Sequence, residues 1–117
     1  MARFEILHNP RCGKSRQTLA RLEAAGVTPT IVEYLAHPPT QKRLREILQL
    51  LGFSDARALM RTKEPIYASL GLARVTDQKA LFDAMVANPI LIERPIVIKD
   101  GKRAVLGRPP ENVDALL

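Results

Sequence analysis

The sequence contains a single cysteine, Cys12, among its 117 residues. One thiol excludes an internal disulfide and a zinc site built from several cysteines. Histidine, aspartate and glutamate are nowhere grouped at the spacing of metal ligands, so we expect no metal ion and no bound cofactor. If Cys12 takes part in redox chemistry, the thiol that resolves its oxidised form must therefore come from another molecule.

Tryptophan is absent, and three phenylalanines and two tyrosines supply few rings for stacking on nucleic-acid bases. The net charge of +6 nevertheless implies an anionic partner, and twelve of the 18 cationic residues are arginines. The planar guanidinium suits the recognition of small planar or tetrahedral oxyanions. We therefore expect a small anion as the partner, and no nucleic acid.

Long apolar runs are also missing. No run approaches the roughly 20 residues that cross a bilayer, and the start of the chain lacks the apolar stretch of a signal peptide. We expect a cytoplasmic protein with no membrane partner. A length of 117 residues with 46% hydrophobic and 26% charged residues fits one globular domain spanning residues 1–117, and we expect it to be a monomer.

Apolar periodicity and turn-forming residues predict the order of the secondary-structure elements. Thr40, Ser54 and the pair Thr76-Asp77 stand where helices are expected to begin, and Asp100-Gly101 predicts a tight type I′ turn between two strands. The expected elements are strands at 3–7, 30–34, 96–99 and 102–106 and helices at 13–25, 41–51, 54–60, 65–70, 77–87 and 111–117. This order predicts an α/β fold with a mixed four-stranded sheet and a helical insertion, the layout of thioredoxin-like (glutaredoxin-like) folds.

Cys12 lies where the first predicted strand meets the first predicted helix, and His8, Arg11, Lys14 and Arg16 flank it in the sequence. A helix N-terminus and nearby cations both favour a thiolate, and they lower the pKa of a cysteine below its free value of about 8.5. We therefore expect Cys12 to be substantially ionised at neutral pH.

Three known loop motifs come close to this stretch, and each lacks one required residue. A P-loop needs glycine where His8 stands, a phosphatase-type cysteine loop needs arginine where Thr18 stands, and a dithiol motif needs a thiol where Ser15 stands. Ser15 offers only a hydroxyl group. That hydroxyl either bonds the thiolate or serves as an ordinary capping or surface group.

Three arginines, Arg61, Arg94 and Arg108, stand at non-helical junctions, where side chains from distant parts of the chain can converge. Ordinary solvated arginines share this setting, so the pattern alone does not assign them to a site. Arg94 precedes Pro95, just before a predicted strand. A proline at that place is a candidate for the cis peptide bond that faces the cysteine in thioredoxin-like folds.

Several blocks along the chain together resemble the glutaredoxin-dependent arsenate reductase (ArsC) family. The matching stretches are His8–Leu19, Tyr34-Leu35 with Pro38-Pro39-Thr40, Arg61, Asn88–Val97 and Gly107-Arg108-Pro109. They cover nearly the whole chain, which makes the resemblance far more specific than any single motif. One departure is Arg11, which stands where the best-known members have alanine. Another is the end of the chain at Leu117, where longer members continue.

The resemblance implies a thioredoxin-like fold in which Cys12 is the nucleophile and Arg61, Arg94 and Arg108 hold the oxyanion. It implies that His8 helps to keep the cysteine ionised, and we include Ser15 among the candidate catalytic residues. The implied reaction is reduction of arsenate to arsenite through an adduct on Cys12. Glutathione would act as reducing co-substrate and glutaredoxin as protein partner.

Two other functions remain open at this point. A glutathione-dependent thiol oxidoreductase with another substrate would use the same site. An RNA polymerase-binding regulator of the Spx type often carries two cysteines, and Ser15 argues against redox switching of that kind.

Overall fold

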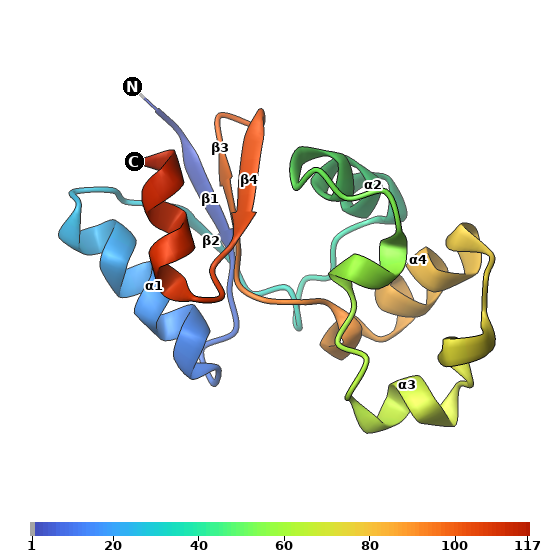
Figure 1. Cartoon of the computed structure of the whole chain (residues 1–117). Helices are drawn as coiled ribbons and strands as arrows, with labels where there is room; N and C mark the ends of the chain where they lie inside the picture. Colours follow the sequence, from blue (N-terminus) through green and yellow to red (C-terminus); the bar gives the residue numbers. More distant parts are fainter. Residues whose placement is uncertain (1) are drawn as a thin grey trace. The chain divides into compact units, whose positions relative to one another are not determined.

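The computed structural model describes residues 2–117, which pack as two compact units. The first unit contains the chain up to His37 together with Arg94–Leu117, and the second is the continuous stretch Pro38–Glu93. The second unit is therefore an insertion into the first. Figure 1 shows the elements of both along the chain.

The first unit is built on one mixed sheet with the strand order β2-β1-β3-β4. Its strands are β1 (Phe4–Leu7), β2 (Thr30–Val32), β3 (Ile96–Lys99) and β4 (Arg103–Leu106). β1 pairs in parallel with β2 and antiparallel with β3, and β3 pairs antiparallel with β4. The α/β fold class with a mixed four-stranded sheet and a helical insertion is thereby confirmed.

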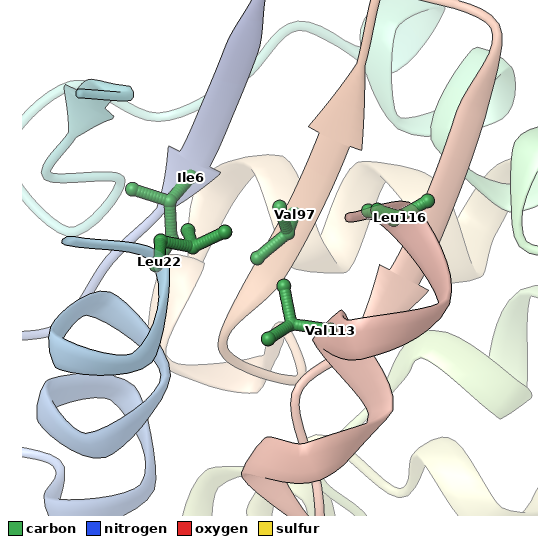
Figure 2. Packing of buried hydrophobic residues seen from close by; sticks show 5 residues of the cluster. All are labelled: Ile6, Leu22, Val97, Val113 and Leu116. Carbon is green, nitrogen blue, oxygen red and sulfur yellow. The ribbon is translucent and has the colours of Figure 1, made fainter. Parts of the chain in front are cut away.

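Two helices cover one face of this sheet: α1 (Gly13–Ala24) and the 3₁₀ helix η4 (Pro110–Leu116). Figure 1 shows η4, the last segment in red, beside α1. Because side chains alternate along a strand, Ile6 and Val97 point to the same face of the sheet, where Leu22 of α1 meets them. Figure 2 shows this core, which Val113 and Leu116 of η4 complete.

Burial of each of these side chains contributes roughly 1.5–3 kcal/mol by removing apolar surface from water. Leu22, Val97 and Val113 are fully buried in this core. The contacts hold α1 and η4 firmly against the strands. The same hydrophobic core therefore fixes the positions of Cys12, which precedes α1, and of Pro109, which precedes η4.

The second unit is helical. Its elements are α2 (Gln41–Leu50), η1 (Ala56–Leu59), α3 (Pro65–Ser69), η2 (Leu72–Arg74), α4 (Gln78–Ala87) and η3 (Pro89–Leu91). α2 and α4 pack together, and each contributes buried residues at helical spacing: Leu44, Ile47 and Leu48 from α2 and Leu81, Phe82 and Met85 from α4. The Arg57 guanidinium donates hydrogen bonds to the carbonyls of Leu72 and Val75, which fixes η1 against the η2 segment.

Most local predictions hold, and the differences have physical causes. The Thr40 and Asp77 side chains cap α2 and α4 as predicted, and Asp100 and Gly101 both have positive φ. The cap of the third helix is Asp55 and not Ser54, because the Asp55 carboxylate accepts from the Arg57 N–H, and the element is a short 3₁₀ helix. The closing helix is likewise 3₁₀.

The second strand ends at Val32 and not at residue 34, since Tyr34 is buried in the turn that follows. Within residues 2–117, no helix has both the length and the apolar character needed to cross a membrane.

Candidate functional site

Cys12 occupies the N-cap of α1, directly after the loop that follows β1. Its backbone is extended, with φ −92° and ψ 121°, and its carbonyl accepts the first helical hydrogen bond, from the Arg16 N–H at 3.0 Å. The Cys12 N–H donates to the carbonyl of Asn9 at 3.0 Å, which closes the loop. The thiol is partly exposed, so a dissolved reactant can reach it.

The pKa of the Cys12 thiol lies below its ordinary value. Burial acts to raise it, but the Ser15 N–H, the charge and hydrogen bond of Arg94, and the Lys14 N–H together outweigh burial. The sulfur makes no full capping hydrogen bond, so the two N–H groups act mainly as dipoles of the helix N-terminus. The lowered pKa is the condition for a nucleophilic thiolate at neutral pH.

Strand register explains why Arg94 and Arg108 lie near the thiol. Leu7 pairs with Ile96, and Ile96 pairs with Leu106. The chain leaves β1 toward Cys12 at the same end of the sheet where Arg94 precedes β3 and Arg108 follows β4. Segments that are far apart in the sequence are thus brought together by three neighbouring strand ends.

Both arginines act on the sulfur. Arg94 lowers the pKa of the thiol, and the Arg108 Nη1 lies 3.9 Å from the Cys12 Sγ, the distance of a long hydrogen bond to sulfur. The Arg94-Pro95 bond is cis, which confirms the prediction for Pro95. The Arg108-Pro109 bond is also cis, and nothing in the sequence predicted it.

His8 and Ser15 form a buried pair behind the cysteine loop. The His8 Nδ1 lies 2.6 Å from the Ser15 Oγ, which also accepts from the Asn9 N–H at 3.0 Å. The Ser15 oxygen thus bonds both the Asn9 N–H and the His8 imidazole, and links the cysteine loop to β1. The Ser15 hydroxyl therefore serves the loop, and Ser15 acts on the sulfur through its backbone N–H.

The pKa of His8 is lowered by burial, which outweighs the Glu33 carboxylate that raises it, while Arg16 lowers it further. The lowered pKa favours the neutral imidazole at neutral pH. His8 binds the hydroxyl of Ser15, the residue whose N–H lowers the pKa of Cys12.

The cations that flank Cys12 in the sequence act differently from our expectation. Lys14 contributes through its backbone N–H. Arg16 turns its guanidinium to the Pro10 carbonyl, with Nη1 at 2.9 Å, and so stabilises the loop. The Arg11 side chain is exposed to solvent, and its backbone N–H donates to the Asn9 side chain at 3.0 Å.

Arg61 belongs to the second unit. Its backbone N–H donates to the Leu91 carbonyl at 2.7 Å, and its guanidinium forms an ion pair with the Glu64 carboxylate at 2.6 Å. Its part in holding an oxyanion remains a prediction.

Sequence reasoning missed residues that hold the site together without reaching the sulfur. Glu33 acts on His8, and Asn112 binds the segment that carries Arg108. Neither residue lies in a motif around the cysteine. Only the parallel pairing of β1 with β2 and the return of η4 to the sheet bring them close.

The fold and site define a thioredoxin-like protein with one thiolate-forming cysteine at a helix N-terminus and two arginines on its sulfur. Among residues 2–117, no group of three histidine, cysteine, aspartate or glutamate side chains could hold a metal ion. The model of the ArsC family matches residues 7–116, and the chain belongs to this family.

Individual relatives cover nearly the whole chain. The protein YfgD of Escherichia coli K12, described as uncharacterized, is 52% identical over 110 residues, which are 93% of this chain and 92% of YfgD. An arsenate reductase of Neisseria meningitidis serogroup A is 46% identical over 118 residues, with full coverage of both chains. The solved structure of an arsenate reductase from Vibrio cholerae superposes with a TM-score of 0.93 at 46% identity, covering 97% of each chain.

Proposed function

We propose that this protein is an arsenate reductase that uses Cys12 as its nucleophile and glutathione with glutaredoxin as its reductants. The observation that carries the proposal is the Cys12 thiol, whose pKa is lowered and whose sulfur lies beside the Arg94 and Arg108 guanidinium groups. Relatives named arsenate reductase at 46% identity support the choice of substrate. YfgD, which is more similar, carries no named activity, so the substrate needs a direct test.

The first step joins the Cys12 sulfur to arsenic. At neutral pH arsenate is a tetrahedral anion, which repels a thiolate. Arg94 and Arg108 would neutralise the oxyanion and orient it, and each such donor typically contributes a few kcal/mol to the transition state. The sulfur displaces one arsenate oxygen, which leaves as water after protonation, and a Cys12–S–As(V) adduct remains.

The second step transfers two electrons. The thiolate of glutathione attacks the Cys12 sulfur, the electron pair of the S–As bond passes to arsenic, and arsenite leaves as As(III). Cys12 is then a mixed disulfide with glutathione, and glutaredoxin takes over the glutathione and restores the thiol. With one cysteine in 117 residues, the chain itself supplies no resolving thiol.

The other candidate residues have supporting parts in this scheme. His8 and Ser15 keep the β1–α1 loop in place, so that the Ser15 N–H faces the sulfur. Arg61 would add a third guanidinium to the oxyanion, as the family resemblance implies. The proposed reductant, glutathione, belongs to the reducing cytoplasm, where we place the reaction.

The proposal is tested by incubating the protein with arsenate, glutathione, glutaredoxin, glutathione reductase and NADPH, and by measuring arsenite directly. We expect arsenite production that Cys12→Ser abolishes and that Arg94→Ala and Arg108→Ala reduce strongly. Arg74→Ala, which removes an equal charge from an exposed residue of the second unit, is the matched control. It should keep the wild-type rate.

The outcome also separates the alternatives. NADPH oxidation on a disulfide substrate, with no arsenite from arsenate, would identify a glutathione-dependent thiol oxidoreductase instead. Retention of RNA polymerase by the immobilised protein, without either activity, would identify a regulator of the Spx type.

A further inference from the structure

Arg108 stands on a short segment after β4 that is held at every carbonyl. The Gly107 N–H donates to the Pro95 carbonyl at 2.9 Å, and the Pro109 carbonyl accepts from the Asn112 N–H at 3.0 Å. The carbonyls of Leu106 and Arg108 accept from the Asn112 side chain, and the Gly107 carbonyl lies 3.3 Å from the Thr18 Oγ1. An exposed loop residue rarely stands on backbone that is tied at so many points.

Two of these hydrogen bonds come from one side chain. The Asn112 Nδ2 donates to the Leu106 carbonyl at 3.1 Å and to the Arg108 carbonyl at 3.2 Å. A carboxamide nitrogen has two hydrogens, so both bonds can form at once. Asn112 of η4 therefore holds the Leu106-Gly107 peptide unit and the Arg108-Pro109 peptide unit, which lie before and after the pair Gly107-Arg108.

Thr18 of α1 holds the same segment from the other side. Its Oγ1 lies 2.8 Å from the Lys14 carbonyl and 3.3 Å from the Gly107 carbonyl. A hydroxyl has one hydrogen, so the nearer Lys14 carbonyl takes most of it, and Gly107 is held mainly by contact. A Cβ on Gly107 would lie 2.5 Å from the Thr18 Oγ1 and 2.8 Å from the Pro95 Cγ.

The support also leads back to the cysteine helix. Arg21 of α1 forms two hydrogen bonds with the Asp114 carboxylate of η4, at 2.8 and 2.7 Å. α1 begins at Cys12 and holds η4 through this ion pair. The Asn112 side chain of η4 binds the Arg108 carbonyl, and the Arg108 guanidinium contacts the Cys12 sulfur. These three contacts and the backbone of α1 and η4 form a closed circuit within the first unit.

We propose that Asn112 is a positioning residue that fixes Arg108 at the Cys12 thiolate, and thereby sets the preference of this thiol for anionic reactants. Asn112 does not reach the sulfur itself. It acts through the backbone of Arg108, whose guanidinium swings away from the sulfur when the Leu106-Gly107 and Arg108-Pro109 peptide units are released. The inference rests on the proposed function only in taking Arg108 as a group that meets the anionic substrate.

The test compares two alkylating agents, neutral iodoacetamide and anionic iodoacetate. Both react with the thiolate by the same displacement, so the ratio of their rate constants cancels the fraction ionised and the intrinsic nucleophilicity. Only the electrostatic environment of the sulfur remains. A general loss of structure would also separate Arg108 from the sulfur, so the ratio is compared only among variants that circular dichroism shows to be folded.

Arg108→Ala should lower the iodoacetate-to-iodoacetamide ratio by roughly tenfold, the effect of one charge a few ångströms away near a protein surface. Asn112→Ala should lower it by about threefold, because the two lost hydrogen bonds free the Arg108 backbone. Gly107→Ala should change the ratio in the same direction, since its Cβ displaces the segment sterically. Ser69→Ala removes an exposed hydrogen bond to the Pro65 carbonyl in the second unit and should leave the ratio unchanged.

The double variant Asn112→Ala with Arg108→Ala decides whether Asn112 acts through Arg108. If it does, adding Asn112→Ala to Arg108→Ala leaves the ratio where Arg108→Ala alone put it. A wild-type ratio in folded Asn112→Ala overturns the proposal. So does a threefold loss that persists when Arg108 is already absent.

These results do not depend on arsenate. If the protein releases no arsenite but Asn112→Ala lowers the ratio, the positioning role stands and the proposed substrate fails. If the wild-type protein reduces arsenate while Asn112→Ala leaves the ratio unchanged, the substrate stands and the positioning role fails.

Discussion

Gly107→Ala tests how closely β4, the cysteine helix and Pro95 fit together. Gly107 does not have a positive φ, so alanine can adopt its backbone conformation and the effect is purely steric. The new Cβ would lie 2.5 Å from the Thr18 Oγ1, 2.9 Å from the Thr18 Cγ2 and 2.8 Å from the Pro95 Cγ. Relief requires these atoms to separate by roughly 0.9 Å at the closest contact.

The neighbours cannot easily give way. Thr18 is fully buried on α1, and Pro95 is buried just before the central strand β3. Overpacking at such a place costs about 1–3 kcal/mol, and we expect about 2 kcal/mol for Gly107→Ala. For a chain of this size that free energy lowers the midpoint of thermal unfolding by roughly 10 °C.

The measurement is urea unfolding of four variants: wild type, Gly107→Ala, Thr18→Ala and the double variant. Thr18→Ala removes two of the three close contacts, so Gly107→Ala should cost about 1 kcal/mol less in that background. Gly13→Ala is the matched control. A Cβ added at Gly13 would have the Arg16 Nη2, 3.8 Å away, as its nearest contact apart from the adjoining residues and the helix backbone. A cost below about 0.5 kcal/mol for Gly107→Ala, or an equal cost in both backgrounds, would refute the steric argument.

Three further predictions follow from the site. Arg94→Ala should raise the pH at which iodoacetamide reactivity of Cys12 inflects, because Arg94 lowers the pKa of the thiol; an unchanged inflection would remove Arg94 from the site. The pKa of His8 lies below its ordinary value of 6.5 in the folded protein. As the pH falls through 6.5, the unfolded chain therefore binds more protons than the folded protein does. The free energy of unfolding, measured with urea, should fall as the pH falls over that window. His8→Asn should flatten that part of the profile, whereas the same change at exposed His37 should not. Protein quenched in acid after incubation with arsenate and glutathione should carry one glutathione by mass, and Cys12→Ser should carry none; sustained turnover with thioredoxin and no glutathione would contradict the scheme.

The sequence predicts those features of the fold and of the site that depend on a few neighbouring residues. Cys12 at a helix N-terminus, the cap at Thr40 and the turn at Asp100-Gly101 follow from short patterns, and the structure bears them out. The cis bond before Pro95 is a candidate only through the expected thioredoxin-like fold, and the structure contains it. Local patterns carry such information because caps and turns are settled within a few residues.

What the sequence does not predict depends on which strands become neighbours. Arg108 acts on Cys12 because Leu106 pairs with Ile96 and Ile96 with Leu7, and register between distant strands is not visible in a local pattern. The lowered pKa of His8 likewise depends on its burial in the folded unit, which a local pattern does not show. The support from Asn112 requires η4 to lie beside the sheet, which is a property of the whole unit.

The interrupted course of the first unit has a consequence for synthesis on the ribosome. β1 lies inside the sheet and pairs with β3, but the whole insertion Pro38–Glu93 separates them in the chain. The insertion is continuous and can fold as soon as it has been made, whereas β1 must wait for β3 to emerge. Until then Cys12 has neither Arg94, which lowers its pKa, nor Arg108 beside its sulfur. The growing chain therefore completes the surroundings of the cysteine only after Arg108 has left the ribosomal tunnel, long after the cysteine itself.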